Sequence, residues 1–229
     1  MINILVVEDS KLIAHALQSL ISTRLGYNCV VAHSMKQASE EMLKYKGKFE
    51  VALLDLGLPD APRGEVVDLV TKFDIPTIIL TGSNLEEDEE KFRHKNIVDY
   101  VIKDGSYSLE YALYVVKRIV SNKDLKVLIV DDSEMACTKM ANLLGRYQLQ
   151  TYTAPSAQKC LEVLKENPDI KIIYIDYLMP DVNGLELTRE IRKKFSKDDI
   201  SIIALSGEAN RKVISKFLKY GANDFIYKG

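Results

Sequence analysis

The sequence predicts an α/β protein made of two doubly wound parallel-sheet domains in tandem, and three observations support this fold class. Four segments recur in the same order at an interval of about 120 residues, which indicates a duplication. Within each copy, short apolar runs alternate with helix-like segments, as in βαβ units. The runs are rich in Val, Ile and Leu without period-2 alternation, which is typical of strands covered on both faces.

The duplication defines the domain organisation. Its period is far above the ~20–50 residues of a solenoid repeat, so each copy is a whole domain. A polar stretch at residues 121–124 separates the copies, and we place domain 1 at residues 1–122 and domain 2 at residues 123–229. The matching segments are residues 4–11 (ILVVEDSK) with 128–135 (LIVDDSEM), 52–60 (ALLDLGLPD) with 173–181 (IYIDYLMPD), 78–83 (IILTGS) with 203–208 (IALSGE), and 99–105 (DYVIKDG) with 224–229 (DFIYKG).

The elements of domain 1 follow from these patterns in chain order. Helical spacing, as in Leu12, Ala16 and Leu20, predicts an apolar face on each helix. Ser10 and its counterpart Ser133 stand where N-cap residues are expected. Alternating along the chain, the predicted strands are residues 2–7, 27–31, 51–55, 77–81 and 99–102, and the predicted helices are residues 11–23, 35–45, 64–72, 86–94 and 107–120.

Domain 2 repeats this plan through a fifth strand at residues 223–228 and lacks the last helix. Without that helix, we expect Ile129 and Ile226 to lose their apolar cover, and we expect the chain to be the N-terminal part of a longer protein.

Composition excludes several classes of protein. Apolar residues make up 47% and charged residues 28%, with a net charge of −2, so a folded core is expected and a basic nucleic-acid surface is not. No apolar run reaches the ~18 residues of a membrane span, and acids follow the first apolar run directly, unlike in a signal peptide. Three cysteines lie far apart, which favours a reduced, cytoplasmic setting.

Polar side chains recur at the predicted carboxyl ends of the strands in both copies. That edge is where a doubly wound sheet binds ligands, so these groups should converge. In domain 1 they are Glu8, Asp9, Asp55, Thr81 and Lys103, and in domain 2 they are Asp131, Asp132, Asp176, Ser206 and Lys228.

Three carboxylates packed together repel one another and need a counter-charge. A hard divalent cation such as Mg²⁺ suits a few carboxylates and could also take a phosphate oxygen. One carboxylate could then attack phosphorus and form an acyl phosphate, while the metal and the lysine neutralise the transferring group. The Thr or Ser hydroxyl could donate to a phosphoryl oxygen. No His or Cys belongs to either set, so imidazole and thiolate chemistry are not expected.

Both copies resemble receiver domains of two-component response regulators, which have the flavodoxin-like (βα)5 fold. The acidic pairs, the strand-end aspartates with Pro59 or Pro180 four positions on, the hydroxyls and the lysines all match. The resemblance implies that Asp55 and Asp176 accept phosphoryl groups from a sensor histidine kinase or a phosphotransfer protein.

The same resemblance implies further site residues. Mg²⁺ would bind the acidic pair, the aspartate and a backbone carbonyl two residues on, at Gly57 or Leu178. An aromatic switch would stand three residues before the lysine, at Tyr100 or Phe225. The role would be that of a phosphoacceptor signalling module rather than an enzyme.

Two features depart from the family pattern. The proline that usually follows the lysine is replaced by Asp104 and Gly229. The segment after Asp55 is one residue longer before its glycine than the segment after Asp176, so the loops at these two aspartates should differ.

Two other functions remain open from the residues. A haloacid-dehalogenase-like phosphatase also uses a strand-end aspartate and Mg²⁺, although its D-x-D motif is absent after strand 1. Alternatively, one domain could be a structural module that only docks the other.

Two surface features could bind partners. Residues 86–90 (EEDEE) could complement a helix dipole or form a partner surface, and tyrosines on residues 107–120 could contribute to a dimer contact. Tandem receivers often precede an effector such as a diguanylate cyclase, so an output domain is expected outside this chain.

Overall fold

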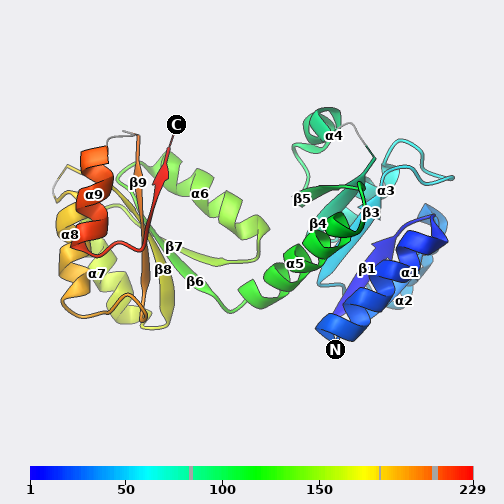
Figure 1. Cartoon of the computed structure of the whole chain (residues 1–229), viewed down its shortest axis with the longest axis horizontal. Helices are drawn as coiled ribbons and strands as arrows, with labels where there is room; N and C mark the ends of the chain where they lie inside the picture. The colour runs from blue at the N-terminus through cyan, green and yellow to red at the C-terminus, as the bar shows by residue number, and fades with distance from the viewer. Residues whose placement is uncertain (83–84, 181, 208–210, 229) are drawn as a thin grey trace. The chain divides into compact units, whose positions relative to one another are not determined.

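The computed structural model describes residues 1–82, 85–180, 182–207 and 211–228, so Gly229 lies outside the described residues. It contains two five-stranded sheets in which all strand pairs are parallel (Figure 1). By their contacts, residues 1–121 form one compact unit and residues from Asn122 onward form the second, except that Arg146–Gln148 are grouped with the first. None of the helices in the described ranges combines the length and the apolarity that a bilayer-spanning segment needs.

Domain 1 alternates strands and helices in the predicted order. Its α1 continues into one wider, π-helical turn, η1, which ends at Gly26 with a left-handed φ of 69°. The elements are β1 (Asn3–Val7), α1 (Lys11–Leu20), η1 (Ile21–Leu25), β2 (Asn28–Ala32), α2 (Met35–Lys44), β3 (Val51–Asp55), α3 (Glu65–Thr71), β4 (Thr77–Thr81), α4 (Leu85–Phe92), β5 (Ile97–Ile102) and α5 (Ser106–Asn122).

Domain 2 follows the same plan, and no helix follows its fifth strand within the described residues. The elements are β6 (Lys126–Val130), α6 (Glu134–Arg146), β7 (Gln150–Ala154), α7 (Ala157–Glu166), β8 (Ile170–Asp176), α8 (Gly184–Arg192), β9 (Ser201–Ser206), α9 (Arg211–Tyr220) and β10 (Asp224–Tyr227).

Strand order places the predicted site residues at one edge of each sheet. The order is β2-β1-β3-β4-β5 in domain 1 and, read from its other edge, β7-β6-β8-β9-β10 in domain 2. The register pairs Val7 with Leu54, and Thr81 with Ile102, so neighbouring strands end at nearly the same level. The residues that end or follow these strands therefore share the carboxyl edge, where ligands bind in such sheets.

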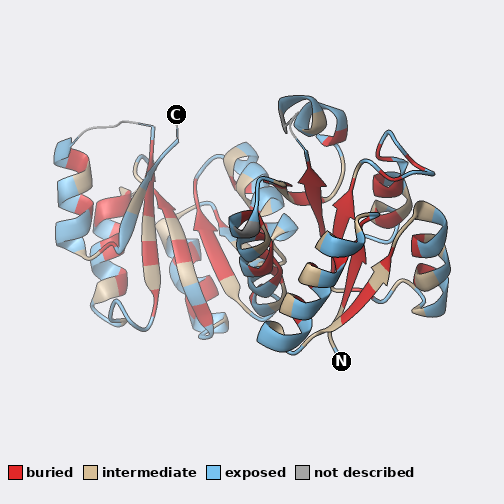
Figure 2. Ribbon diagram, turned by 45° about the vertical axis from the view of Figure 1, so that its right-hand side comes forward, coloured by how far each residue is buried: buried red, intermediate tan, exposed pale blue. Residues whose placement is uncertain are grey.

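The sheet of domain 1 is packed on both faces, as its apolar strands predict (Figure 2). On one face, α1 and α5 contribute Leu17, Ala112, Val116 and Ile119 to a core shared with β1, β3 and β4. On the other face, helices α2 and α3 pack against the same strands.

The sheet of domain 2 is packed unequally. Residues from α7, α8 and α9 form a large core on one face, whereas α6 is the one helix among the described residues that covers the small cluster on the other. The expectation that Ile129 loses its cover is wrong: it is 1% exposed because it packs with Cys137 and Leu144 of α6. Ile226, at the sheet edge, is 44% exposed as expected.

The two predicted N-cap residues behave differently at their helix starts. Ser133 Oγ accepts a bond from the Ala136 amide at 3.3 Å, as expected of a cap. Ser10 is the N-cap residue of α1, as predicted, but its side chain makes no capping hydrogen bond, and its amide donates to Glu8 instead.

The loops after the strand-end aspartates differ, as the extra residue in domain 1 predicted. There, Gly64 precedes α3 with a left-handed φ of 74°, a conformation that favours glycine. In domain 2 the corresponding Gly184 is the first residue of α8, and a Cβ on it would clash with the Asp176 carbonyl oxygen.

Candidate functional site

The carboxyl edge of the first sheet gathers three carboxylates. Glu8 and Asp9 follow β1, and Asp55 ends β3. One oxygen from each lies within 4.8 Å of the others. Glu8 and Asp55 are buried while Asp9 is exposed, so the cluster opens to solvent on one side.

Lys103 follows β5 and reaches into this cluster. Its Nζ lies 2.9 Å from Asp55 Oδ1 and 3.3 Å from Glu8 Oε2, and its backbone amide donates to the Thr81 carbonyl at 2.8 Å. Burial of the ammonium acts to lower the Lys103 pKa, but the hydrogen bond and charge of Asp55 outweigh it and the pKa is raised. Lys103 therefore stays charged and supplies part of the counter-charge.

Burial also affects the acids. The pKa of Glu8 is raised, first by desolvation and then by the neighbouring charge of Asp55. Hydrogen bonds from backbone amides partly offset the repulsion between the carboxylates. The Ser10 amide donates to Glu8 at 3.1 Å, and the Gly57 amide donates to Asp55 Oδ1 at 3.2 Å. Gly57, an expected ligand position, thus lies directly beside the aspartate.

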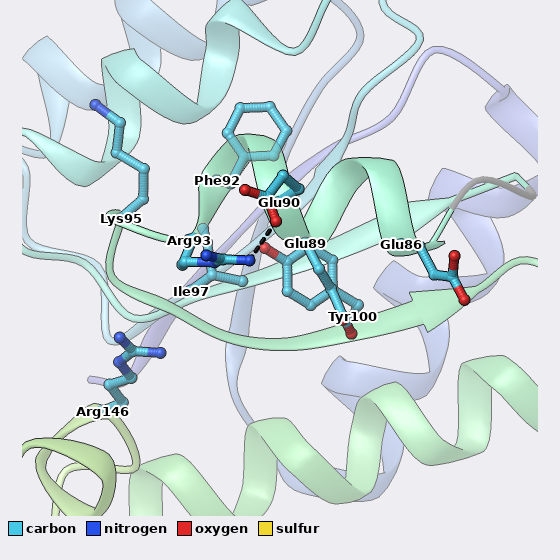
Figure 3. Close-up of a pocket in the computed structure, with 9 residues that line it drawn as sticks. All are labelled: Glu86, Glu89, Glu90, Phe92, Arg93, Lys95, Ile97, Tyr100 and Arg146. Carbon is cyan, nitrogen blue, oxygen red and sulfur yellow. Dashed lines mark hydrogen bonds and ion pairs between the residues drawn. The ribbon is translucent and has the colours of Figure 1, made fainter. Parts of the chain in front are cut away.

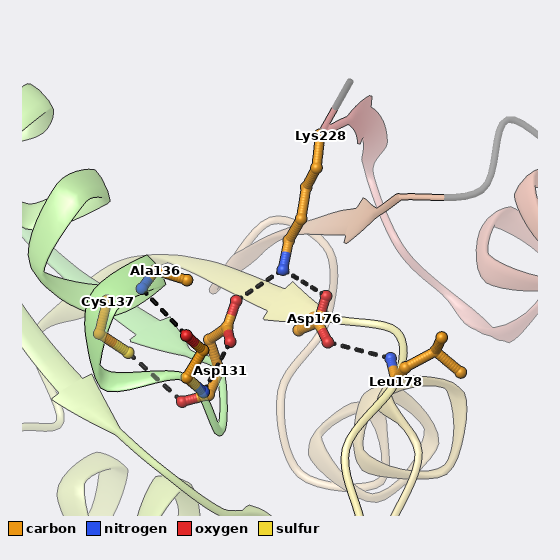
Figure 4. A network of polar contacts seen from close by, with 7 residues as sticks. Asp131, Ala136, Cys137, Asp176, Leu178 and Lys228 are labelled. Carbon is orange, nitrogen blue, oxygen red and sulfur yellow. Dashed lines mark hydrogen bonds and ion pairs between the residues drawn. The ribbon is translucent and has the colours of Figure 1, made fainter.

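Domain 2 holds the same arrangement (Figure 4). Asp131 and Asp132 follow β6, Asp176 ends β8, and one oxygen from each lies within 4.8 Å of the others. Lys228 follows β10, and its Nζ lies 2.6 Å from Asp131 Oδ2 and 2.5 Å from Asp176 Oδ1.

Neighbouring backbone groups fix the acids of domain 2. The Leu178 amide donates to Asp176 Oδ2 at 3.1 Å, and the Ser133 amide donates to Asp131 Oδ1 at 2.9 Å. Cys137, which the sequence did not single out, is buried on α6 and donates its thiol to the Asp131 carbonyl at 3.4 Å. Desolvation raises the pKa of Asp176, against the opposing effect of Lys228.

The two hydroxyls end the fourth strands and are buried. Thr81 is 4% exposed and Ser206 is 1% exposed. Thr81 Oγ1 donates to Asp88 Oδ2 on α4 at 2.6 Å. This partner was missed in the sequence because it depends on where α4 packs, although the run of acids at residues 86–90 was a signal that an acid would be near.

The two aromatic positions have different neighbours. Tyr100 on β5 is half-buried beside Glu89, Glu90 and Arg93 (Figure 3), and burial followed by the nearby charge of Glu89 raises its pKa to about 12. Phe225 on β10 is half-buried too, but its ring lies against Phe217 of α9 with centroids 6.4 Å apart.

The strand order and the two acidic, lysine-containing sites define the class: tandem flavodoxin-like domains with a carboxylate site at the carboxyl edge of each sheet. A family model for the response regulator receiver domain matches residues 4–109 and 127–229. The chain therefore belongs to the response regulator receiver family and contains two receiver domains. This membership favours the signalling class over the phosphatase alternative.

Individual relatives agree. The chain is 30% identical over 102 residues to a two-component response regulator of Oryza sativa subsp. japonica, covering 44% of this chain and 76% of the relative. It is 31% identical over 105 residues to a chemotaxis protein CheY homolog of Campylobacter jejuni, covering 45% of this chain and 81% of the relative.

Solved structures extend the likeness to the whole chain. Two structures of a two-component system response regulator/GGDEF domain protein are 34% identical to it, with TM-scores of 0.92 and 0.91. Each alignment covers 100% of this chain and 92% of that chain. The tandem arrangement of two receiver folds therefore also occurs in a related protein.

Proposed function

We propose that this chain is a phosphorylation-dependent signalling module in which Asp55 and Asp176 each accept a phosphoryl group. The observation that carries the proposal is the pair of matching sites, each with three clustered carboxylates and one lysine. Strand-end aspartates held by a lysine and a backbone amide are positioned nucleophiles, and carboxylates can form covalent phosphoryl intermediates.

The charge of each site supports Mg²⁺ as the cofactor. Three carboxylates face one ammonium, so two negative charges remain, which a divalent cation would balance. The oxygen donors suit a hard cation. Glu8, Asp9 and Asp55 would hold it in domain 1, and Asp131, Asp132 and Asp176 in domain 2, with the carbonyls of Gly57 and Leu178 as further ligands. Bound there, the ion would neutralise negative charge on the phosphoryl oxygens.

The transfer step follows from these residues. A carboxylate oxygen of Asp55 attacks phosphorus, the bond from phosphorus to the donor's nitrogen or oxygen breaks, and its electron pair leaves with the donor. Lys103 lies 2.9 Å from the attacking carboxylate and would stabilise the added negative charge. The hydroxyl of Thr81 or Ser206 would then donate a hydrogen bond to the phosphoryl group in its own domain. The aromatic side chain of Tyr100 or Phe225 would change position together with that hydroxyl.

The donors would be a sensor histidine kinase or a phosphotransfer protein. The output would be a domain outside this chain, and a diguanylate cyclase is our candidate because the similar solved structures come from a response regulator/GGDEF domain protein. The module itself would not turn over an external substrate.

Intact-mass measurement tests the proposal. Incubation with Mg²⁺ and a small acyl phosphate should add up to two phosphoryl groups, and excess chelator should prevent it. A mass gain limited to one phosphoryl group would mean that one domain is not phosphorylated and has a structural role. No mass gain at all would refute the proposal.

A further inference from the structure

The Thr81 hydroxyl of domain 1 is already committed to a hydrogen bond. Its oxygen lies 2.6 Å from Asp88 Oδ2, within the ~2.5–2.7 Å typical of a hydroxyl donating to a carboxylate. Thr81 is 4% exposed, so water has little access to replace this partner. Asp88 comes from the first part of α4, which makes the bond a direct link between the end of β4 and that helix.

Thr81 also belongs to the rim of the acidic site. Its carbonyl accepts the Lys103 amide at 2.8 Å, and the Lys103 ammonium contacts Asp55 at 2.9 Å. In the function proposed above, the Thr81 hydroxyl would donate a hydrogen bond to the phosphoryl group on Asp55. A hydroxyl carries one proton, so it cannot donate to Asp88 and to a phosphoryl oxygen at the same time.

We propose that Asp88 is a positioning residue that competes with the phosphoryl group for the Thr81 hydroxyl and so opposes the activated state of domain 1. The proposal rests on the function proposed above. In the unphosphorylated domain Asp88 holds the hydroxyl toward α4. On phosphorylation the O–H···O bond to Asp88 is exchanged for one to the phosphoryl oxygen, and Asp88 is released.

The release of Asp88 would be transmitted through α4. Asp88 is one of five consecutive acids at residues 86–90, so a carboxylate that loses its donor is left among like charges. Lys91 is the one basic residue in the sequence of α4, and its ammonium contacts the Arg63 carbonyl. A shift of α4 is the simplest relief, and it would carry the state of Asp55 to the surface of the domain.

Domain 2 differs at the corresponding place. The repeat interval that relates Thr81 to Ser206 relates Asp88 to Val213, whose side chain has no hydrogen-bonding atom. Helix α9 contains four cationic residues and no acid in RKVISKFLKY. The competition through a fourth-helix carboxylate is therefore specific to domain 1.

The test uses the full chain with Asp176→Asn, so that the measured binding comes from domain 1. The probe is beryllofluoride with Mg²⁺, which mimics the phosphoryl group, and the readout is its apparent affinity. Asp88→Ala should raise the affinity about tenfold, the effect of removing one charge-assisted hydrogen bond. Asp88→Asn should give a smaller rise, because an amide oxygen still accepts. Glu86→Ala, which removes the same charge from the same turn, should change the affinity less than about twofold, since exposed charges couple weakly.

A double-mutant cycle separates competition from a general effect of charge. In a Thr81→Ala background, Asp88→Ala should leave the affinity unchanged. The proposal is overturned if Asp88→Ala alone has no effect, or if it has the same effect without the Thr81 hydroxyl. Both outcomes leave the proposed function intact as long as Asp55→Asn abolishes binding. Absence of binding by the starting protein would instead refute the proposed function and this inference together.

Discussion

Lys103 in domain 1 reaches a glutamate, Glu8, at 3.3 Å, whereas Lys228 in domain 2 reaches an aspartate, Asp131, at 2.6 Å. The lysine and the backbone amide both contact Oδ1 of Asp55, but in domain 2 they contact different oxygens of Asp176. The two sites thus reach the same set of charged groups through different local geometry. The comparison shows that a glutamate in domain 1 and the shorter aspartate in domain 2 both keep a contact with the lysine.

The surroundings of the two sites diverge much more. Helix α4 reads LEEDEEKF while α9 reads RKVISKFLKY, so the helices that follow the hydroxyls have opposite charge. Tyr100 lies beside Glu89, Glu90 and Arg93 (Figure 3), whereas the ring of Phe225 lies against Phe217. If both receivers take the modification proposed above, they would present it beside helices of opposite charge.

The largest expected effect is the loss of phosphorylation at one site while the other site still accepts a phosphoryl group. Asp55→Asn and Asp176→Asn should each remove one of the two phosphoryl groups, because each removes one nucleophile. Intact mass after treatment with an acyl phosphate measures this. Asp60→Asn, which changes an exposed acid on the same loop as Asp55, is the control and should retain both. Loss of both groups on changing one aspartate would mean that the sites are not independent.

The packing difference should appear in hydrogen exchange. Amides of β9 and β10 should exchange faster than those of β4 and β5, since α5 buries Val116 and Ile119 on the sheet of domain 1 and has no counterpart among the described residues of domain 2. Burying one such side chain contributes about 1.5–3 kcal/mol, so a difference of about 3 kcal/mol in opening free energy is expected. Equal protection in the two pairs of strands would contradict this.

Metal dependence should separate by domain. At a concentration about 100 times its dissociation constant, Mg²⁺ should stabilise each domain by about 2.7 kcal/mol. Asp9→Ala should remove this gain from domain 1 only, and Asp132→Ala from domain 2 only. Hydrogen exchange with and without Mg²⁺, read separately for each domain, checks the expectation. A gain that survives either substitution in its own domain would argue against the predicted ligands.

The raised pKa of Glu8 should make the stability of domain 1 depend on pH. Because the Glu8 pKa is raised above 4.5 in the folded domain, the native state holds this proton more tightly than the unfolded chain. The contribution of Glu8 to the free energy of unfolding of metal-free domain 1 is therefore highest below pH 4.5, and it falls as pH rises through the raised pKa. Denaturant unfolding of Glu8→Gln at a series of pH values should lack this fall, and an unaltered pH dependence would contradict the assignment.

The smallest expected effect concerns helix caps, a feature that the two domains share. Ser34 and Ser156 cap α2 and α7, each accepting an amide bond at 3.2 Å. Replacing either by Ala should destabilise its own domain by about 1 kcal/mol. Urea unfolding followed by circular dichroism measures both, with Ser121→Ala as an exposed control that caps no helix. Markedly unequal effects would show that the two caps are not equivalent.

The fold and most of the candidate site could be predicted because they depend on chain order. Strand-end residues such as Asp55 and Lys103 share an edge in any doubly wound sheet, so their convergence needs no knowledge of packing. Ile129 was misjudged because its cover comes from α6 rather than from a fifth helix. The Thr81–Asp88 bond was not predictable, since it requires the helix to turn one of five similar acids toward the strand.

The strand order of domain 1 has a consequence for biosynthesis. All five of its strands pair only with one another, and all of them lie within the first 102 residues. At about 5–20 residues per second, translation of the second domain takes several seconds or more after the first is complete. Small domains fold at rates of about 1 to 10⁵ per second, so domain 1 should close its sheet before the similar strands β6 to β10 leave the ribosome. Two related sheets can then share one chain without exchanging strands.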